Sequence, residues 1–159
     1  MLDRRAGINL LLLSVVCLLG LQVWQIQQAD KRTALTQLDP DGIIRIEIDD
    51  LSGRQILLER EGSVWRIGDK RADANRIAQL LGLCKTPSLE NFDLPADLRP
   101  FGLEAPVFEL KLNSETLAFG NTDPINGWRY VRFAGQVHLI ADGFYHHLSA
   151  PPEVWEESR

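Results

Sequence analysis

Hydrophobic residues form one long run near the start of the chain. No charged residue occurs between Arg5 and Asp30, and residues 8–24 are apolar apart from isolated small or amide side chains. This length reaches the lower end of the roughly 17 to 25 residues that a transmembrane helix needs, and an interfacial aromatic residue ends it. The run therefore predicts a single N-terminal transmembrane helix. The residues expected to anchor it in the bilayer are Leu10, Leu13, Val16, Leu19 and Trp24.

The residues around this run favour retention of the helix over its removal. Signal peptidase needs small residues at −3 and −1. A cut after Gly20 would place Leu18 at −3, and a cut after Ala29 would place Gln27 there. A lipoprotein leader needs a small residue before its cysteine, but valine precedes Cys17. We therefore predict a retained signal anchor, and a cleaved signal peptide is the alternative.

The charges beside the run are nearly balanced, with Arg4 and Arg5 before it and Lys31 and Arg32 after it. The short N-terminus ahead of a long polar domain is typical of a bacterial signal anchor, so we expect the domain on the far side of the inner membrane, in the periplasm. The expected segments are a cytoplasmic tip and anchor at 1–29, a stalk and turn at 30–42, a periplasmic domain at 43–152 and a tail at 153–159.

After the stalk, the pattern of apolar positions changes to that of strands. Residues 43–49 alternate apolar and polar side chains, which is typical of a half-buried strand, and tight turns then lead into short runs at 54–61 and 63–67. Residues 73–85 follow a helical spacing, with Asp73 as the expected N-cap and Ile77, Leu80, Leu81 and Cys84 on one face. The first half therefore predicts a βββα unit.

The second half repeats this order after a proline-rich connection at 85–106, whose apolar residues predict an ordered loop. Strands are expected at 107–112, 115–120, 128–133 and 136–140, and a short helical segment at 141–148. By eye, LLEREGSVWRI resembles YVRFAGQVHLI, which suggests a degenerate duplication. The predicted fold class is α+β: a transmembrane helix followed by a mainly antiparallel sheet with helices, in two degenerate βββα-like halves.

Composition narrows the partners that such a domain could have. Residues 30–159 carry 15 Lys and Arg against 21 Asp and Glu, a net charge of about −6 with no basic run. Nucleic-acid binding depends on clustered cations, so nucleic acid is not expected as a partner. The domain's one cysteine, Cys84, is expected to be a buried apolar residue, because Cys17 lies in the membrane run and cannot pair with it.

Several stretches, taken in order, resemble the bacterial domain-of-unknown-function family 4340. They are LTQLDPDGIIRIEI, LEREGSVWRI, DANRIAQLL, LRPFGLEAP, LAFGNTDPINGWRYVR and QVHLI, and the F-G-L-x-x-P and G-x-x-Y-V-R pieces are the most specific. The resemblance covers residues 35–152. It implies an accessory role in the bacterial envelope, beside ABC-type export systems of the gliding-motility kind, and it brings no catalytic residues.

The search for catalytic or cofactor chemistry gives no strong candidate. His146 and His147 are adjacent, so on a helix their side chains diverge and do not easily join His138 at one metal ion. The aspartates at 39, 41, 49 and 50 lack the spacing of an EF-hand and suit turns and strand ends. Neither a nucleophile elbow nor a phosphate-binding loop is present. We therefore predict that the protein is not an enzyme and needs no cofactor or metal.

The strand at 128–133 offers a recognition surface instead. By its period of two, Trp128, Tyr130 and Arg132 share one face, and if Val131 and Phe133 face the core the first set forms an aromatic and basic patch. We expect a non-catalytic interaction module of an ABC-type envelope transport complex, with membrane proteins as partners and the lipid bilayer bound through the helix. The alternatives are a periplasmic polysaccharide- or peptide-binding module and a bitopic assembly subunit of a secretion or pilus machine.

Overall fold

The computed structural model describes Val16 and residues 34–157, and the compact domain begins at Ala34. The expected transmembrane helix lies outside the described residues, as do all its expected anchor residues except Val16. In the described part of the chain, no helix is both long enough and apolar enough to span a bilayer.

The first half of the domain is an antiparallel meander followed by a helix. Its elements are β1 (Arg45–Asp50), β2 (Gln55–Glu61), β3 (Val64–Ile67), the short β4 (Lys70–Arg71) and α2 (Ala74–Leu81). The alternation in β1 buries Ile46 and Ile48 and leaves Arg45, Glu47 and Asp49 on the other face. Asp73 caps α2 as expected, because its carboxylate accepts hydrogen bonds from the backbone N–H groups of Asn75 (2.9 Å) and Arg76 (3.2 Å).

The second half is built in the same way. Its elements are β5 (Glu90–Asp93), β6 (Phe108–Leu112), β7 (Glu115–Thr122), β8 (Arg129–Phe133), β9 (Gln136–Ile140) and α3 (Tyr145–Leu148). Asn113 turns the chain between β6 and β7 with φ 55, and its side-chain oxygen accepts the backbone N–H groups of Ile44 (3.0 Å) and Arg45 (3.2 Å). This turn therefore also fixes the start of β1, at the centre of the sheet.

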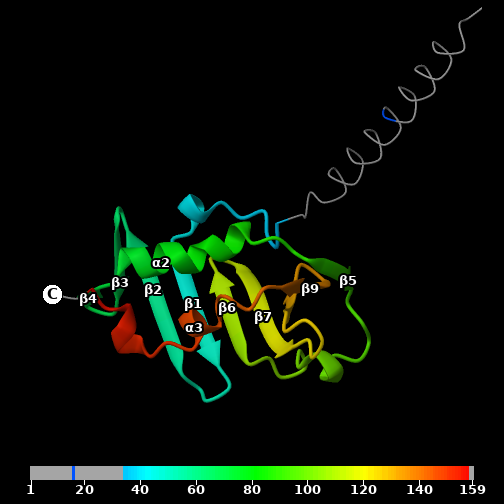
Figure 1. Cartoon of the computed structure of the whole chain (residues 1–159). Coiled ribbons are helices and arrows are strands. Elements are labelled where there is room, and N and C mark those ends of the chain that lie inside the picture. Colours follow the sequence, from blue (N-terminus) through cyan, green and yellow to red (C-terminus); the bar gives the residue numbers. More distant parts are fainter. Residues whose placement is uncertain (1–15, 17–33, 158–159) are drawn as a thin grey trace, which may run out of the picture. The chain divides into compact units, whose positions relative to one another are not determined.

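All the strands belong to one nine-stranded sheet of order β4-β3-β2-β1-β6-β7-β8-β9-β5, and every pair in it is antiparallel. The two meanders meet where β1 pairs with β6, from Ile46 opposite Leu112 to Asp50 opposite Phe108. Figure 1 shows α2 crossing the strands of the first meander. The α+β class with an antiparallel sheet is confirmed, and each half consists of a meander and a helix.

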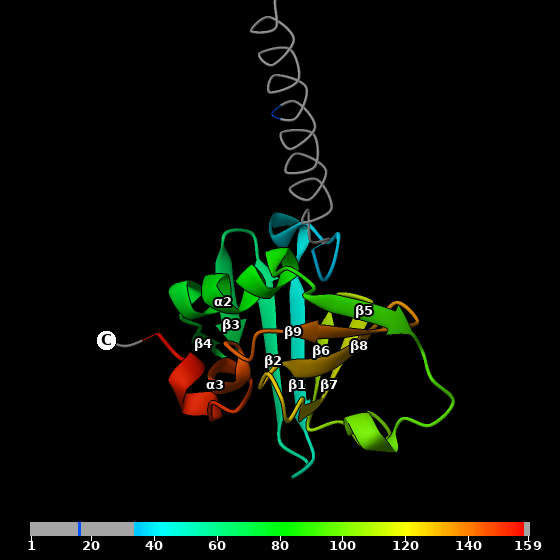
Figure 2. The same cartoon turned by 45° about the vertical axis from the view of Figure 1, so that its right-hand side comes forward.

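The main core lies on the face of the sheet that carries the helices. Figures 1 and 2 show the sheet as curved, with α2 and α3 on its concave side. Ile77, Leu80 and Leu81 of α2 pack there against buried residues of both meanders, and Trp155 in the short 3-10 helix η4 (Pro152–Trp155) is fully buried. Leu35, before the first strand, belongs to the same core. Burial of such side chains supplies most of the folding free energy.

Three elements differ from what the pattern of apolar positions predicts, and the first is the two-residue strand β4, which no apolar alternation marks. The helix expected at 73–85 ends at Leu81, and the chain continues as the 3-10 helix η2 (Gly82–Lys85), in which Cys84 is still buried. The connection at 85–106 contains β5, which pairs with β9 at the edge of the sheet. Strand β5 was missed because an edge strand with mostly exposed side chains lacks the apolar alternation of a buried one.

Candidate interaction surfaces

A second, smaller core covers part of the outer face of the sheet, the face opposite α2 and α3. Leu103, Ala118 and Val137 are buried there, and they pack with Phe92, Leu98, Phe101 and Tyr130. The loop that carries η3 (Arg99–Phe101) thus covers the outer face over β7, β8 and β9, and we call this region the covered half. The proline-rich connection is ordered, as its apolar residues predicted.

The F-G-L-x-x-P piece forms the contact between this loop and the sheet. Gly102 has φ 66, and a Cβ atom there would lie 2.5 Å from the side chain of Asn121. Gly120 faces it at the irregular pairing of β7 with β8, where a side chain would clash with the carbonyl oxygen of Phe101. Two glycines therefore permit the close approach of two backbones, which explains their place in the sequence.

Two of the three expected recognition residues, Tyr130 and Arg132, lie on the face that the period-two pattern predicts, and Trp128 precedes the start of β8. Val131 is fully buried and Phe133 packs against the main core, so Tyr130 and Arg132 point to the outer face. Trp128, Tyr130 and Arg132 are each half-buried. The ring of Tyr130 packs edge-on against Phe101, with centroids 5.0 Å apart, and its burial, with the charge of Asp123, raises the tyrosine pKa. Tyr130 is therefore part of the packing of the covered half.

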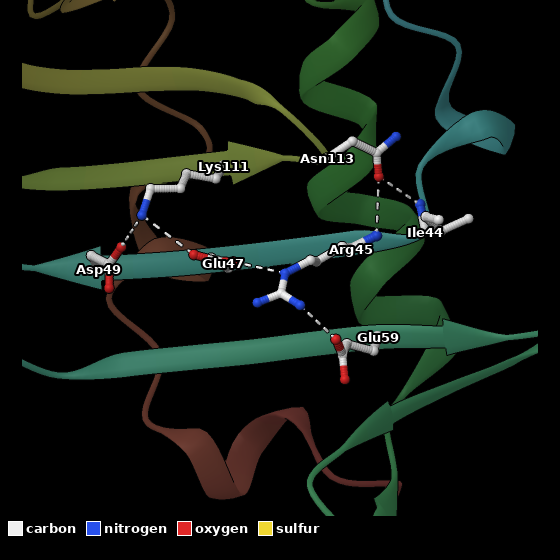
Figure 3. Close-up of polar contacts among 7 residues, drawn as sticks. All are labelled: Ile44, Arg45, Glu47, Asp49, Glu59, Lys111 and Asn113. Carbon is white, nitrogen blue, oxygen red and sulfur yellow. Dashed lines mark hydrogen bonds and ion pairs between the residues drawn. The ribbon is translucent and has the colours of Figure 1, made fainter.

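The rest of the outer face, over β2, β1 and β6, carries a ladder of charged side chains, and we call this region the open half. Arg45 donates to Glu47 at 2.7 Å and to Glu59 at 2.8 Å, while Lys111 lies 3.3 Å from both Glu47 and Asp49 (Figure 3). The hydrogen bond from Arg45, with that from Lys111, lowers the pKa of Glu47. Hydrogen bonds to Glu47 and Asp49 raise the pKa of Lys111.

A groove lies on the other side of the sheet, between α2 and the hairpin of β2 and β3. It encloses about 350 Å³, and we call it the α2 groove. Trp65, Ile77 and Leu81 form its apolar floor, and Arg60 and Lys85 stand at its rim. Sequence reasoning missed it, because its residues come from separate elements whose proximity depends on the tertiary fold.

The histidines have structural surroundings. His138 is buried, and its Nδ1 lies 3.0 Å from the hydroxyl of Ser88, which donates to the carbonyl oxygen of Glu90 at 2.9 Å. The direction of the hydrogen bond between Ser88 and His138 depends on the tautomer of the imidazole, and burial lowers the pKa of His138. His147 is also buried, on α3, and its Nδ1 has no partner among the described residues. Burial, with the charges of His146 and Arg76, lowers its pKa.

Metal coordination and thiol chemistry find no support in the described residues. No group of three or more His, Cys, Asp and Glu side chains in them is placed to hold a metal ion. The aspartates serve turns: Asp39 accepts from the N–H of Asp41 at 3.1 Å, and Asp50 accepts from the N–H of Ser52 at 2.8 Å. Burial raises the pKa of the Cys84 thiol, which keeps it protonated and unreactive.

Comparison with known proteins gives one match. A family model described as "Domain of unknown function (DUF4340)" matches residues 71–159, more than half of the chain. No curated protein and no solved structure matches. The matched segment takes in α2 and all elements from β5 onward, including the F-G-L-x-x-P and G-x-x-Y-V-R pieces, whereas the first three strands precede it.

Proposed function

The chain belongs to the DUF4340 family, and we propose that it is a non-catalytic, single-pass protein of the bacterial inner membrane. In this proposal its periplasmic domain acts as an accessory interaction module of an ABC-type envelope transport complex. The support for membrane attachment is the uncharged run of residues 8–24, which no small-residue cleavage pattern follows. The support for the transport complex is the resemblance of the chain to its family.

The observation that carries the interaction role is the uneven covering of the sheet. An antiparallel sheet commonly leaves one face to solvent, so we base the proposal on the contrast between the two parts of this face and not on its exposure alone. Here the covered half is sealed by the loop that carries Phe101, while the open half presents paired charges of mixed sign directly to solvent. A polar face on a rigid sheet can select a partner through electrostatic complementarity.

The contacts of Ser88 support a non-catalytic role. A serine nucleophile needs a base that accepts its proton. Ser88 is buried, and its hydroxyl lies 2.9 Å from the backbone carbonyl oxygen of Glu90, which competes with His138 for its proton. The packing of Tyr130 against Phe101 weighs against a stacking platform for sugars, which would need an exposed ring.

The two halves of the domain also support an internal duplication. Strands β1–β4 followed by α2 correspond in order to β6–β9 followed by α3, and β1 and β6 are antiparallel neighbours at the centre. This correspondence differs by one strand from the sequence alignment of residues 57–67 with 130–140. We propose that both halves derive from one meander–helix unit, related by a two-fold axis through the middle of the sheet.

Three measurements test the proposed function. Mass spectrometry of the native protein should find the N-terminus intact, and a periplasm-active reporter fused at Arg159 should be active. Cross-linking in membranes, followed by purification in mild detergent, should recover membrane subunits of an ABC-type transporter in stoichiometric amounts. A new N-terminus near Asp30, or a reporter active only in the cytosol, would refute the membrane anchor. Recovery of no transporter subunit would refute the accessory role.

A further inference from the structure

We propose that the α2 groove binds a short acidic peptide segment of a partner protein, with one apolar side chain on the groove floor and carboxylates at its rim. This inference rests on the proposed function and adds a second partner contact to that of the open half. The groove is a distinct surface from the open half, since it lies on the side of the sheet that α2 covers.

The charges of the groove point to an acidic ligand. Most Lys and Arg side chains among residues 34–157 form an ion pair with a carboxylate. Those with no carboxylate partner among the described residues are Arg60, Arg76, Lys85 and Arg132. Two of these four line the α2 groove, and Asp41 is its acidic residue. In a domain with a net charge of about −6, this groove is a local cationic site.

Arg60 is held in place for such a role. Its Nε donates to the carbonyl oxygen of Gly62 at 3.1 Å, and its Nη1 donates to that of Asp41 at 3.0 Å. These neutral acceptors fix the guanidinium without neutralising its charge. A guanidinium held in this way binds a carboxylate with little further loss of side-chain entropy.

The shape of the groove favours an extended peptide over a compact anion. Ala74, Ala78 and Gly82 all line it and are exposed, and their spacing of four places them along one side of α2 and its 3-10 continuation. At a rise of about 1.5 Å per residue, this strip of small side chains is about 12 Å long. An extended chain rises about 3.3 Å per residue, so about four residues fit along it.

The floor supplies the apolar part of the recognition. Trp65 is only 7% exposed and Ile77 only 1%, so both are firmly seated in the core while they line the groove. Side chains of an extended peptide alternate, so an apolar residue pointing at this floor directs its two neighbours towards the rim. The best ligand therefore has an apolar residue between two acidic ones.

The direct test uses the full-length protein in neutral detergent micelles and a fluorescein-labelled peptide, Gly-Asp-Leu-Glu-Gly. Fluorescence anisotropy should show saturable binding, and the amide peptide Gly-Asn-Leu-Gln-Gly should bind at least about fivefold more weakly. The double variant R60Q/K85Q should weaken binding of the acidic peptide by about five- to tenfold, because two solvent-screened charge contacts are lost. Removal of the opposing charge in Asp41→Asn should tighten binding about twofold.

The matched control is Arg66→Gln. Arg66 lies on the same hairpin but is paired with Glu61 at 2.6 Å and does not line the groove, so its loss should leave peptide affinity unchanged. Absence of saturable binding, or equal affinities for the wild type and R60Q/K85Q, would overturn the inference. Displacement of the peptide by inorganic phosphate at the same concentration would also overturn it, because the site would then recognise a small anion. Self-association that R60Q/K85Q abolishes would assign the groove to a second copy instead.

Co-purification separates this inference from the proposed function. If the wild type and R60Q/K85Q recover the same transporter subunits in equal amounts, the function stands and the groove is not the contact. If the wild type recovers none while the peptide still binds through Arg60 and Lys85, the groove recognises acidic peptides and the transporter role fails. Loss of the subunits in R60Q/K85Q, with retention in Arg66→Gln, supports both.

Discussion

The replacement Asp142→Asn is expected to be one of the most destabilising single polar changes in the domain. Arg129 is buried, with its side chain only 8% exposed, and its Nε and Nη2 donate to the two oxygens of Asp142 at 2.5 and 2.8 Å. Its Nη1 donates to the carbonyl oxygen of Gly120 at 2.6 Å, and the guanidinium lies 4.9 Å from the ring centre of Tyr145. One side chain thus joins β8, the irregular segment of β7 and α3.

The expected loss of stability follows from the buried positive charge that the replacement leaves without a counter-ion. Asparagine keeps the shape of Asp142 but removes its charge, so the guanidinium stays buried without a counter-ion. Loss of one partner of a buried pair costs about 3 to 5 kcal/mol. The side chain of Asp142 is 27% exposed, and water can replace part of the lost interaction. We therefore expect a loss of about 2 to 3 kcal/mol in the free energy of unfolding.

The assay is urea unfolding of the full-length protein in detergent, followed by tryptophan fluorescence, because Trp65 and Trp155 are buried in the core. The matched control is Asp97→Asn, which breaks the ion pair of Asp97 with Arg99 at 2.9 Å on an exposed surface. That variant should unfold with the wild-type midpoint, because solvent screens an exposed pair. A loss below about 1 kcal/mol for Asp142→Asn, or equal effects of both variants, would refute the view that burial decides the value of this pair.

Three further changes test other features of the fold by the same unfolding assay. Ala134 has φ 48 ahead of Gly135 in the β8–β9 turn, where asparagine is favoured, so Ala134→Asn should stabilise the protein by about 1 kcal/mol; an unchanged midpoint would contradict this. Gly102→Ala should lower the free energy of unfolding more than Gly53→Ala does. Both glycines have positive φ, but only a Cβ atom at position 102 would also meet the side chain of Asn121. Equal losses of stability would show that this contact is unimportant. Burial lowers the pKa values of His138 and His147 below 6.5 in the folded protein. As the pH drops below about 6.5, the unfolded chain therefore binds more protons than the folded protein, and the free energy of unfolding should fall. His147→Gln should flatten this dependence between pH 5 and 7, and an identical pH profile would exclude His147 as its source.

Strands and faces could be predicted where burial leaves a mark in the sequence. The alternation around Ile46 and Ile48 located β1, and the same period placed Val131 and Tyr130 on opposite faces of their strand. Asp73 marked the start of α2 because a capping carboxylate is a local requirement. These features depend on near neighbours in the chain, so the sequence alone was sufficient.

Other features depend on contacts between distant residues and had no local signal. β5 is a strand because β9 offers it an edge, and its sequence Glu-Asn-Phe-Asp does not favour that state by itself. The F-G-L-x-x-P piece is visible in the sequence, but only the structure shows that a Cβ atom at Gly102 would meet the side chain of Asn121 and one at Gly120 would meet the carbonyl oxygen of Phe101. The contact of Phe101 with Tyr130, which partly buries the expected recognition patch, likewise could not be predicted from the sequence because it depends on the tertiary fold.

The distribution of charge links this fold to a role in binding. The open half carries more carboxylates than cations, with Glu47, Asp49 and Glu59 against Arg45 and Lys111, while the α2 groove has two cations to one carboxylate. The sheet thus separates surfaces of opposite sign, although the domain as a whole is acidic. Added salt would weaken a partner at either surface, so salt dependence alone cannot locate the contact. Two double variants distinguish the two surfaces. Replacement of Arg60 and Lys85 removes the cations of the α2 groove and reduces the affinity for an acidic segment. Replacement of Glu47 and Glu59 removes carboxylates of the open half and cannot reduce that affinity.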